Sequence, residues 1–271
     1  MVGKDLRMPK ITKAVVPAAG LGTRLHPMTE ERPKEMLPIG GRPMIYYAMR
    51  EAALSGLEHI YMVVNKQKPS LRTYLESGQF EDQHITFIDQ PVPLGSGEAI
   101  YRIKGMIGEE PFALMMPDFL LYGSSPALSQ MMPLYERFEQ DIVGVVRIGK
   151  TEAEGFGNVG IFQPTPWEKD MVIVRDVSKK VKDPLVLKEG ETIYKTIGRC
   201  ILTPHFFSYL EKVRPMQGDW DDAPAFRAMC EERKVIGKIL KGKGFDVGNP
   251  IGYRAANEKF EKLSGVRAQP S

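Results

Sequence analysis

The sequence predicts an α/β fold, a Rossmann-like, mostly parallel mixed sheet that is flanked by helices and carries a small β region in its second half. Two observations favour this class. In the first half of the chain, short apolar runs alternate with helical patterns, which is typical of a parallel sheet with helices on both faces. In the second half, apolar segments follow one another with little helix between them.

The expected elements of the first half alternate along the chain. Short apolar runs predict strands, and apolar residues that recur every three or four positions predict helices. The expected strands are Lys13–Val16, His59–Val64, Ile85–Ile88, Pro111–Met115 and Ile142–Arg147. The expected helices are Met44–Leu54, Pro69–Leu75, Gly97–Ile107 and Ala127–Phe138. Gly56 follows the first of these helices, where glycine is a usual C-terminal stop.

The second half is expected to be richer in strand. The expected strands are Val159–Phe162, Met171–Val177, Tyr194–Leu202 and Val235–Leu240. The expected helices are Pro204–Leu210, Ala223–Glu232 and Pro250–Leu263. Since no linker rich in Gly, Pro or Ser divides the chain, we expect one domain over residues 11–265 after a flexible lead-in at residues 1–10.

The composition excludes several classes of protein. Hydrophobic residues make up 42% of the chain and charged residues 26%, which is ordinary for a globular protein. A net charge of +3 without a Lys/Arg run argues against nucleic-acid binding, and no apolar run is long enough to span a membrane. Two distant cysteines, Cys200 and Cys230, have no metal-ligand spacing and indicate a reducing compartment. A cytoplasmic enzyme is therefore expected.

A turn of small residues follows the first expected strand. Backbone N–H groups in such a turn can approach an anion closely, because no bulky side chain intervenes. The cations Arg24, Arg32 and Lys34 follow within a few positions, so the segment is a plausible polyphosphate cradle. The small residues of the turn are Ala18, Ala19, Gly20 and Gly22.

The pattern of this segment is neither of the two common phosphate loops, because it lacks both the third glycine of the dinucleotide fingerprint and the Gly-Lys-Ser/Thr ending. Gly20-Leu-Gly-Thr-Arg24 with Pro33-Lys-Glu-Met-Leu-Pro38 instead resembles the signature of sugar-1-phosphate nucleotidyltransferases. The second motif is most similar to that of bacterial UTP–glucose-1-phosphate uridylyltransferases. The resemblance runs from about Ile11 to Tyr253.

This resemblance implies a Mg²⁺-dependent transfer of a uridylyl group from UTP to glucose 1-phosphate, giving UDP-glucose and pyrophosphate. It also implies a homo-oligomer, a dimer or a tetramer. The catalytic residues that it implies are Arg24, Lys34 and Lys179. The nucleotide-binding residues that it implies are Ala18, Ala19, Gly20, Gly22, Glu35, Gln90 and Gly95.

The segment Gln90–Gly97 follows the third expected strand. A Gln side chain offers one acceptor and two donors, which suits a pyrimidine edge, and Gly95 and Gly97 would let a flat ring lie close to the backbone. Taken alone, the segment is also compatible with a proline-rich connection that ends in a helix start. The resemblance favours contact with uracil.

Two aspartates are candidate metal ligands. Asp118 follows the fourth expected strand, and Mg²⁺ is usually held by one or two carboxylates together with phosphate oxygens. Asp246 lies in a late Asp-x-Gly-Asn motif. Their spacing in the sequence does not show that they meet, and only the resemblance pairs them.

The expected sugar side departs from the family pattern. Phe156 and Gly157 match an aromatic-Gly pair that lies against the sugar, although the segment is also compatible with a plain hairpin turn. Ser178 stands where the family usually has a sugar-binding Glu, and the phosphate-binding lysine is either Lys179 or Lys180. Trp220 replaces a second Glu and could stack on a sugar or fill the core.

These departures leave two alternatives open. One is the same chemistry with another sugar 1-phosphate or with dTTP. The other is a non-catalytic paralogue that binds a nucleotide sugar and regulates a partner enzyme.

Overall fold

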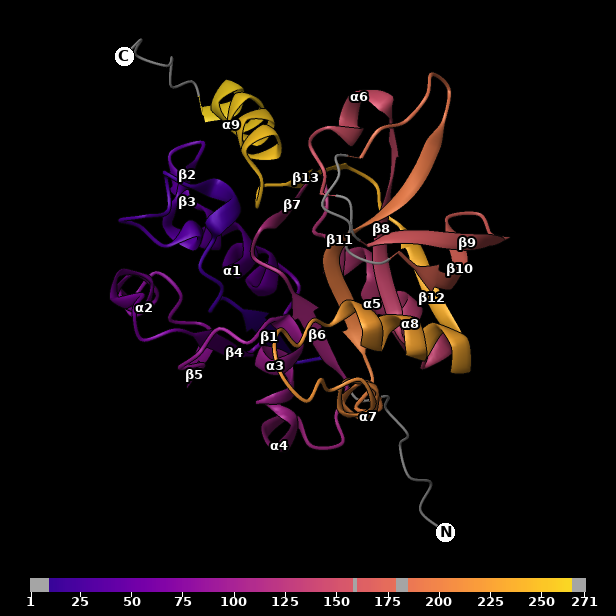
Figure 1. Ribbon diagram of the computed structural model, residues 1–271, viewed down its shortest axis with the longest axis horizontal. Helices are drawn as coiled ribbons and strands as arrows, with labels where there is room; N and C mark the ends of the chain where they lie inside the picture. Colours follow the sequence, from indigo (N-terminus) through magenta and orange to yellow (C-terminus); the bar gives the residue numbers. More distant parts are fainter. Residues whose placement is uncertain (1–9, 158–159, 179–184, 265–271) are drawn as a thin grey trace.

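The computed structural model describes residues 10–157, 160–178 and 185–264 (Figure 1). The strands of its large sheet are β1 (Lys13–Pro17), β4 (His59–Val64), β5 (His84–Asp89), β6 (Phe112–Met115), β8 (Ile142–Gly149), β9 (Ile161–Glu168), β10 (Met171–Val177), β11 (Thr192–Leu202) and β12 (Val235–Ile239). Two ribbons pair β7 (Phe119–Tyr122) with β13 (Lys243–Asp246), and β2 (Pro38–Ile39) with β3 (Arg42–Pro43).

The helices cover the sheet and connect its strands. They are α1 (Met44–Leu54), α2 (Pro69–Leu75), α3 (Ser96–Tyr101), α4 (Lys104–Ile107), α5 (Ala127–Phe138), α6 (Lys150–Ala153), α7 (Phe206–Lys212), α8 (Ala223–Glu232) and α9 (Pro250–Ser264), with short 3-10 turns η1 (Thr23–Leu25) and η2 (Lys34–Met36). None of the helices in the described ranges combines the length and the apolar character that crossing a membrane requires.

The nine strands follow the order β5-β4-β1-β6-β11-β8-β12-β10-β9 across the sheet (Figure 1). The four strands β5, β4, β1 and β6 are parallel, whereas β11 runs antiparallel to both β6 and β8. The predicted mixed α/β sheet is thus confirmed, and it takes strands from both halves of the chain. The carboxyl ends of β1 and β6 meet at one edge, where ligands of such sheets bind.

Residues of β1 alternate between two apolar layers. Ala14 and Val16 pack on one face of the sheet with α1, α2 and α5, whereas Val15 packs on the other face with α3, α4, α7 and α8. Figure 1 shows α3, α4, α7 and α8 together on the lower side of the sheet. Because both faces are covered, the strand is apolar throughout rather than alternating with polar residues.

Most of the expected elements are present, and several have the expected bounds. The prediction of one continuous helix over Gly97–Ile107 is wrong. The chain instead forms two short helices, α3 and α4, with a break at residues 102–103. Where a strand was expected at Val159–Phe162, β9 begins at Ile161 and continues to Glu168; Val159 lies outside the described residues. The ribbons were not predicted, because two to four residues carry no period that could be recognised.

Helix α9 packs beside the β2–β3 ribbon (Figure 1), and its first turn contacts the backbone of Asp246. The Tyr253 hydroxyl donates a hydrogen bond to the Pro38 carbonyl (2.6 Å), and the Gly40 N–H donates one to Asn257 (3.1 Å). At Gly252, an added Cβ would lie 2.0 Å from the carbonyl oxygen of Asp246. The first turn of α9 therefore approaches the end of β13 more closely than a side chain would allow.

We expect Gly252→Ala to lower the free energy of unfolding by about 1–3 kcal/mol or more, because the new methyl group would overlap backbone atoms that cannot rotate away. Urea denaturation measures this loss. Gly105→Ala in α4 is the matched control, since a Cβ there meets no atom within 4 Å. Equal stability of the two variants would contradict the close packing of α9.

Candidate active site

The turn after β1 is held from its inner side by one lysine. The Nζ of Lys68 donates hydrogen bonds to the carbonyl oxygens of Ala18 (2.8 Å) and Gly20 (2.5 Å). Since the N–H of a trans peptide points away from its carbonyl, the N–H groups of Ala19 and Leu21 face away from Lys68. The turn thus directs backbone donors outward, which is the arrangement that an anion-binding turn requires.

Lys68 also binds Glu35. The Glu35 side chain is 0% exposed, and its two carboxylate oxygens lie 3.0 and 2.8 Å from the Lys68 Nζ. Burial lowers the pKa of Lys68, although the charge of Glu35 opposes that effect. The carboxylate of Glu35, which was expected to bind the nucleotide, is therefore engaged inside the protein and ties η2 to the turn after β1.

Lys34, the neighbour of Glu35, points to the other side of η2. Its Nζ donates a 2.7 Å hydrogen bond to Oδ2 of Asp118. Burial opposes the charged form of Lys34, but the charges of Asp118 and Glu35 outweigh it and raise the pKa of the lysine. Gly22 (φ 73°) lets the Lys34 side chain pass, because an added Cβ would lie 3.0 Å from the Lys34 Cβ. The lysine is thus kept charged beside a carboxylate.

The two candidate metal ligands meet in the fold. Asp118 lies between β6 and β7, and Asp246 is the last residue of β13, which pairs with β7 so that Asp246 stands opposite Phe119. The guanidinium of Arg24 bridges the two carboxylates, with Nη2 3.8 Å from Asp118 Oδ2 and Nη1 3.9 Å from Asp246 Oδ2. The pairing that the sequence could not establish is therefore present in the structure.

The two carboxylates differ in their titration. Burial opposes the charge of Asp118, but Lys34 and Arg24 outweigh it and lower the pKa of Asp118. Burial raises the pKa of Asp246, and the negative charge of Asp118 adds to that effect, while Arg24 partly offsets it. The surroundings of Asp118 thus favour its ionised form, whereas those of Asp246 favour its protonated form more than water does.

Both carboxylates and the Arg24 guanidinium face the space above Gly248. A Cβ added to Gly248 would lie 2.8 Å from Arg24 Nη2, 2.8 Å from Asp118 Oδ2 and 3.2 Å from Asp246 Oδ1. Within the described ranges, no group of three or more His, Cys, Asp or Glu side chains could hold a metal. Two carboxylates fit Mg²⁺ that is shared with the phosphates of a ligand, which is its usual mode of binding.

Of the expected sugar-side residues, Gly157 contacts one of these carboxylates. The Gly157 N–H donates a 2.9 Å hydrogen bond to Asp246 Oδ2, and the Phe156 ring is buried. The hydroxyl of Ser178 accepts a hydrogen bond from the Ile161 N–H (3.0 Å), so it is oriented by the start of β9. Lys179 and Lys180 lie outside the described residues.

The expected base-binding segment is held by its own neighbours. The amide nitrogen of Gln90 donates to Glu98 (2.6 Å) and to the Gly95 carbonyl (3.1 Å), so the orientation of this side chain is fixed. Gly95 is also required by the packing of the chain itself, because an added Cβ would lie 2.5 Å from the carbonyl oxygen of Trp220. The close approach at the glycines is made by the chain itself, so their spacing does not by itself indicate a flat ligand.

Trp220 belongs to the core. Its side chain is buried, its indole N–H donates to the Leu210 carbonyl (3.2 Å), and its ring packs against Tyr101 at 5.0 Å between centroids. Of the two roles that the sequence left open, filling the core is therefore confirmed.

Comparison with known proteins agrees with this geometry. The family model described as nucleotidyl transferase matches residues 13–262. The chain belongs to the nucleotidyl transferase family. It is similar to a Bacillus subtilis and a Staphylococcus epidermidis UTP–glucose-1-phosphate uridylyltransferase, each 31% identical; the alignments cover 92% and 91% of this chain and 89% and 91% of the relatives.

Solved structures lead to the same family. One neighbour is a UDP-glucose pyrophosphorylase complexed with UDP-glucose, with a TM-score of 0.79, 30% identity, and coverage of 93% of this chain and 99% of the other. Another is a UTP-bound enzyme of this kind from Acinetobacter baumannii, with a TM-score of 0.76, 28% identity, and coverage of 92% and 93%. The predicted family resemblance is confirmed.

Sequence reasoning missed three buried cations of this nucleotidyl transferase that bind loops around the site. Besides Lys68, they are Lys195 in β11, whose Nζ donates to the Gly157 carbonyl (2.6 Å), and Arg199. Arg199 donates to the carbonyls of Met116 (2.6 Å) and Phe119 (3.0 Å) on either side of Asp118. No sequence motif predicts the roles of Lys68 and Lys195, because their partners are distant in sequence. For Arg199, the preceding glycine inside a predicted strand is a weak signal.

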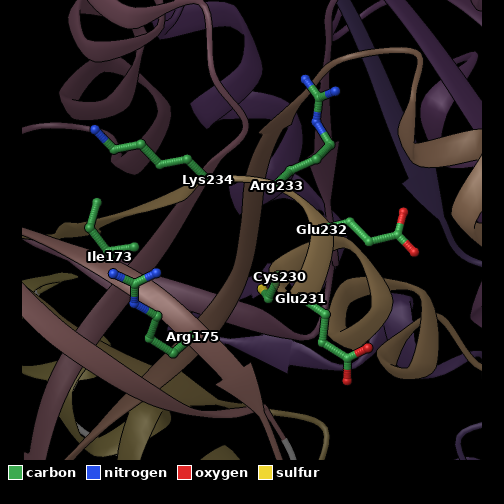
Figure 2. A pocket seen from close by; sticks show the side chains of 7 residues that line it. All are labelled: Ile173, Arg175, Cys230, Glu231, Glu232, Arg233 and Lys234. Carbon is green, nitrogen blue, oxygen red and sulfur yellow. The ribbon is translucent and has the colours of Figure 1, made fainter.

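A surface hollow lies elsewhere on the molecule. It is formed by β10, the end of α8 and the residues that follow it, and its volume is about 340 Å³. Figure 2 shows the side chains that line it. Its lining residues are Ile173, Arg175, Cys230, Glu231, Glu232, Arg233 and Lys234. It contains none of the predicted site residues, so we assign the active site from the converging side chains and not from this hollow.

Two acidic side chains meet beside the Gly95 turn. The Ser96 hydroxyl lies 2.6 Å from Asp222 Oδ1 and 3.2 Å from Asp221 Oδ1. Burial, together with the charge of Asp221, raises the pKa of Asp222 from 3.8 to about 7. The folded chain therefore binds a proton that the unfolded chain has lost, and stability falls as the pH rises from about 4 to about 7.

For Lys68→Met we expect a loss of about 3–5 kcal/mol in the free energy of unfolding, because Glu35 would remain buried without its counter-charge. Guanidinium denaturation measures it. Lys66→Met is the control, since that side chain is 75% exposed. The double variant Lys68→Met/Glu35→Gln should recover part of the loss; no recovery would show that the ion pair is not the cause.

For Asp222→Asn we expect a gain in Tm that increases between about pH 4 and pH 7 and then stays constant, because the variant needs no proton at this buried position. Calorimetric unfolding at pH 5, 6, 7 and 8 measures it. Asp82→Asn removes an exposed carboxylate and controls for the change in net charge. A gain that is independent of pH would contradict the assignment.

Proposed function

We propose that this nucleotidyl transferase transfers a uridylyl group from UTP to glucose 1-phosphate, giving UDP-glucose and pyrophosphate with the assistance of Mg²⁺. The observation that carries the proposal is the convergence of Lys34, Arg24, Asp118 and Asp246 next to the outward-facing turn after β1. The names of the relatives support the choice of UTP and glucose 1-phosphate.

The reaction is an in-line displacement. A phosphate oxygen of the sugar phosphate attacks the α-phosphorus of UTP, a new P–O bond forms, and the bond to pyrophosphate breaks. A phosphate dianion is already a nucleophile, so no general base is needed, and catalysis consists of alignment and charge stabilisation. Mg²⁺, when held by Asp118 and Asp246, supplies positive charge to the phosphate oxygens.

The protein residues have distinct roles in this proposal. Lys34, which its surroundings keep charged, stabilises charge at the α-phosphate, and Arg24, whose side chain is 53% exposed, reaches toward the leaving pyrophosphate. Lys179 holds the sugar phosphate. The turn after β1 binds the nucleotide phosphates through its outward N–H groups, and Gln90 contacts the base.

The environment and assembly of the enzyme remain part of the proposal. We infer a cytoplasmic homo-oligomer, a dimer or a tetramer, from the resemblance to the uridylyltransferases. Size-exclusion chromatography with light scattering measures the oligomeric state.

The proposal is tested by pyrophosphate release, with UTP, dTTP, CTP, ATP and GTP each combined with several sugar 1-phosphates, in Mg²⁺ and in EDTA. We expect Mg²⁺-dependent release with UTP and glucose 1-phosphate. Release with another pair would keep the mechanism and change the substrate, an outcome that Ser178 favours because its hydroxyl replaces a carboxylate. If no pair gives pyrophosphate release and the protein still binds UDP-glucose, the result would favour the regulatory paralogue.

Lys34→Met should lower kcat about 10²- to 10³-fold, by analogy with the loss of one donor from an oxyanion hole. Steady-state kinetics with the pair chosen by the panel measure the change. Lys104→Met is the control, because that lysine pairs with Glu211 on the surface away from the site. Turnover close to that of the control would exclude the role of Lys34.

A further inference from the structure

Lys195 is a buried cation that no sequence motif assigns to the site. It lies in β11, where its backbone stands opposite Val146 of β8 and Ile161 of β9. Its side chain is 0% exposed and is among the largest fully buried side chains of the chain. Lysine is almost never fully buried unless its charge is engaged, so this position needs a specific explanation.

The contacts of Lys195 lead to the metal carboxylate. Its Nζ donates a 2.6 Å hydrogen bond to the Gly157 carbonyl, and the Gly157 N–H donates a 2.9 Å hydrogen bond to Asp246 Oδ2. One residue of the sugar-side loop is therefore bound on both sides, by a strand of the sheet and by a candidate metal ligand. Through Gly157, the position of Lys195 is linked to that of Asp246.

Close packing around Gly157 restricts the movement of its backbone. An added Cβ would lie 3.2 Å from Arg24 Nη1 and 3.2 Å from Asp246 Oδ2. The Gly157 backbone thus lies against both the carboxylate and the guanidinium. A shift of this backbone would change the surroundings of two proposed catalytic groups at once.

Charge supports the same arrangement. Burial lowers the pKa of Lys195 to about 8, although the negative charge of Asp246 opposes that effect. Conversely, the positive charge of Lys195 acts to lower the pKa of Asp246 and so partly offsets the effect of burial. Lys195 and Asp246 thus lie close enough for their charges to interact, which agrees with the link through Gly157.

We propose that Lys195 is a positioning residue for nucleotidyl transfer, which fixes the Gly157 backbone against Asp246 so that the sugar-side loop and the metal carboxylate keep one geometry. The inference rests on the proposed function, since it assigns Lys195 to the same site. It requires the hydrogen bond to Gly157, and it does not require that Lys195 touches the substrate.

The test compares Lys195→Met, which removes the donor, with Lys195→Gln, which keeps a neutral donor. For Lys195→Met we expect the KM for the sugar 1-phosphate and the Mg²⁺ concentration at half-maximal rate each to rise at least about tenfold, while the KM for UTP stays within about twofold; a tenfold change corresponds to 1.4 kcal/mol. For Lys195→Gln we expect recovery to within about threefold of the native values.

Lys238→Met is the matched control. Lys238 is also largely buried (7% exposed) in the same sheet, but it pairs with Asp170 in a loop that contains none of the site residues. A purely structural role for Lys195 would lower Tm in both methionine variants and leave the kinetic constants unchanged, which would overturn the inference. Loss in Lys195→Met without recovery in Lys195→Gln would also overturn it, because charge and not the hydrogen bond would then be essential.

A readout without catalysis separates this inference from the proposed function. Amide hydrogen exchange at Gly157 should be at least about tenfold faster in Lys195→Met than in Lys238→Met, because the Gly157 N–H is protected by its bond to Asp246. Faster exchange in a protein that makes no UDP-glucose would keep the positioning role and reject the substrate. Unchanged exchange would reject the positioning role even if the enzyme makes UDP-glucose.

Discussion

Asp118 and Asp246 place two buried carboxylates around one small space, and like charges in such surroundings repel strongly. Lys34 offsets this repulsion by direct contact with Asp118, and Arg24 does so by bridging both side chains. The three remaining parts of the site, which are the turn after β1, η2 and the Gly157 loop, all lie around this cluster. Of these parts, η2 carries Lys34, and the Gly157 loop contributes a backbone N–H to Asp246.

A common device holds the loops of the site in place. Lys68 donates to carbonyls of the turn after β1, Arg199 to carbonyls on both sides of Asp118, and Lys195 to the carbonyl of Gly157. Each of these cations is buried, so it reaches its loop from the protein interior. Groups fixed in this way need little reorganisation during a reaction, which is the basis of electrostatic catalysis.

This device has a physical cost, which the structure offsets by pairing. A buried charge without a partner is strongly destabilising. Lys68 has Glu35, and Arg199 has Glu51 at 2.9 Å. Glu51 also accepts a hydrogen bond from the Leu128 N–H. The contacts that hold the Asp118 loop through Arg199 and Glu51 therefore continue to the start of α5. The helices on this face of the sheet are thereby connected to the site by polar contacts as well as by apolar packing.

The base side and the sugar side are organised differently. Gln90 is oriented by Glu98 within the same segment, and the segment around Trp220 packs on the glycines nearby. On the sugar side, Ser178 and Gly157 are instead oriented by strands of the second half, β9 and β11. The proposed base side is therefore held by Glu98 and by the distant segment around Trp220, whereas the proposed sugar side is held by strands of the second half of the sheet.

The sequence by itself determined the α/β class, the bounds of elements such as α1, α5 and β10, and the local motif that carries Arg24 and Lys34, because periodicity and turn chemistry act over a few residues. Only the tertiary structure decided that Asp246 meets Asp118, since that contact follows from the pairing of β13 with β7. It also decided the roles of Lys68, Arg199 and Lys195. Their partners lie far away in the sequence, and such long-range contacts leave no local pattern.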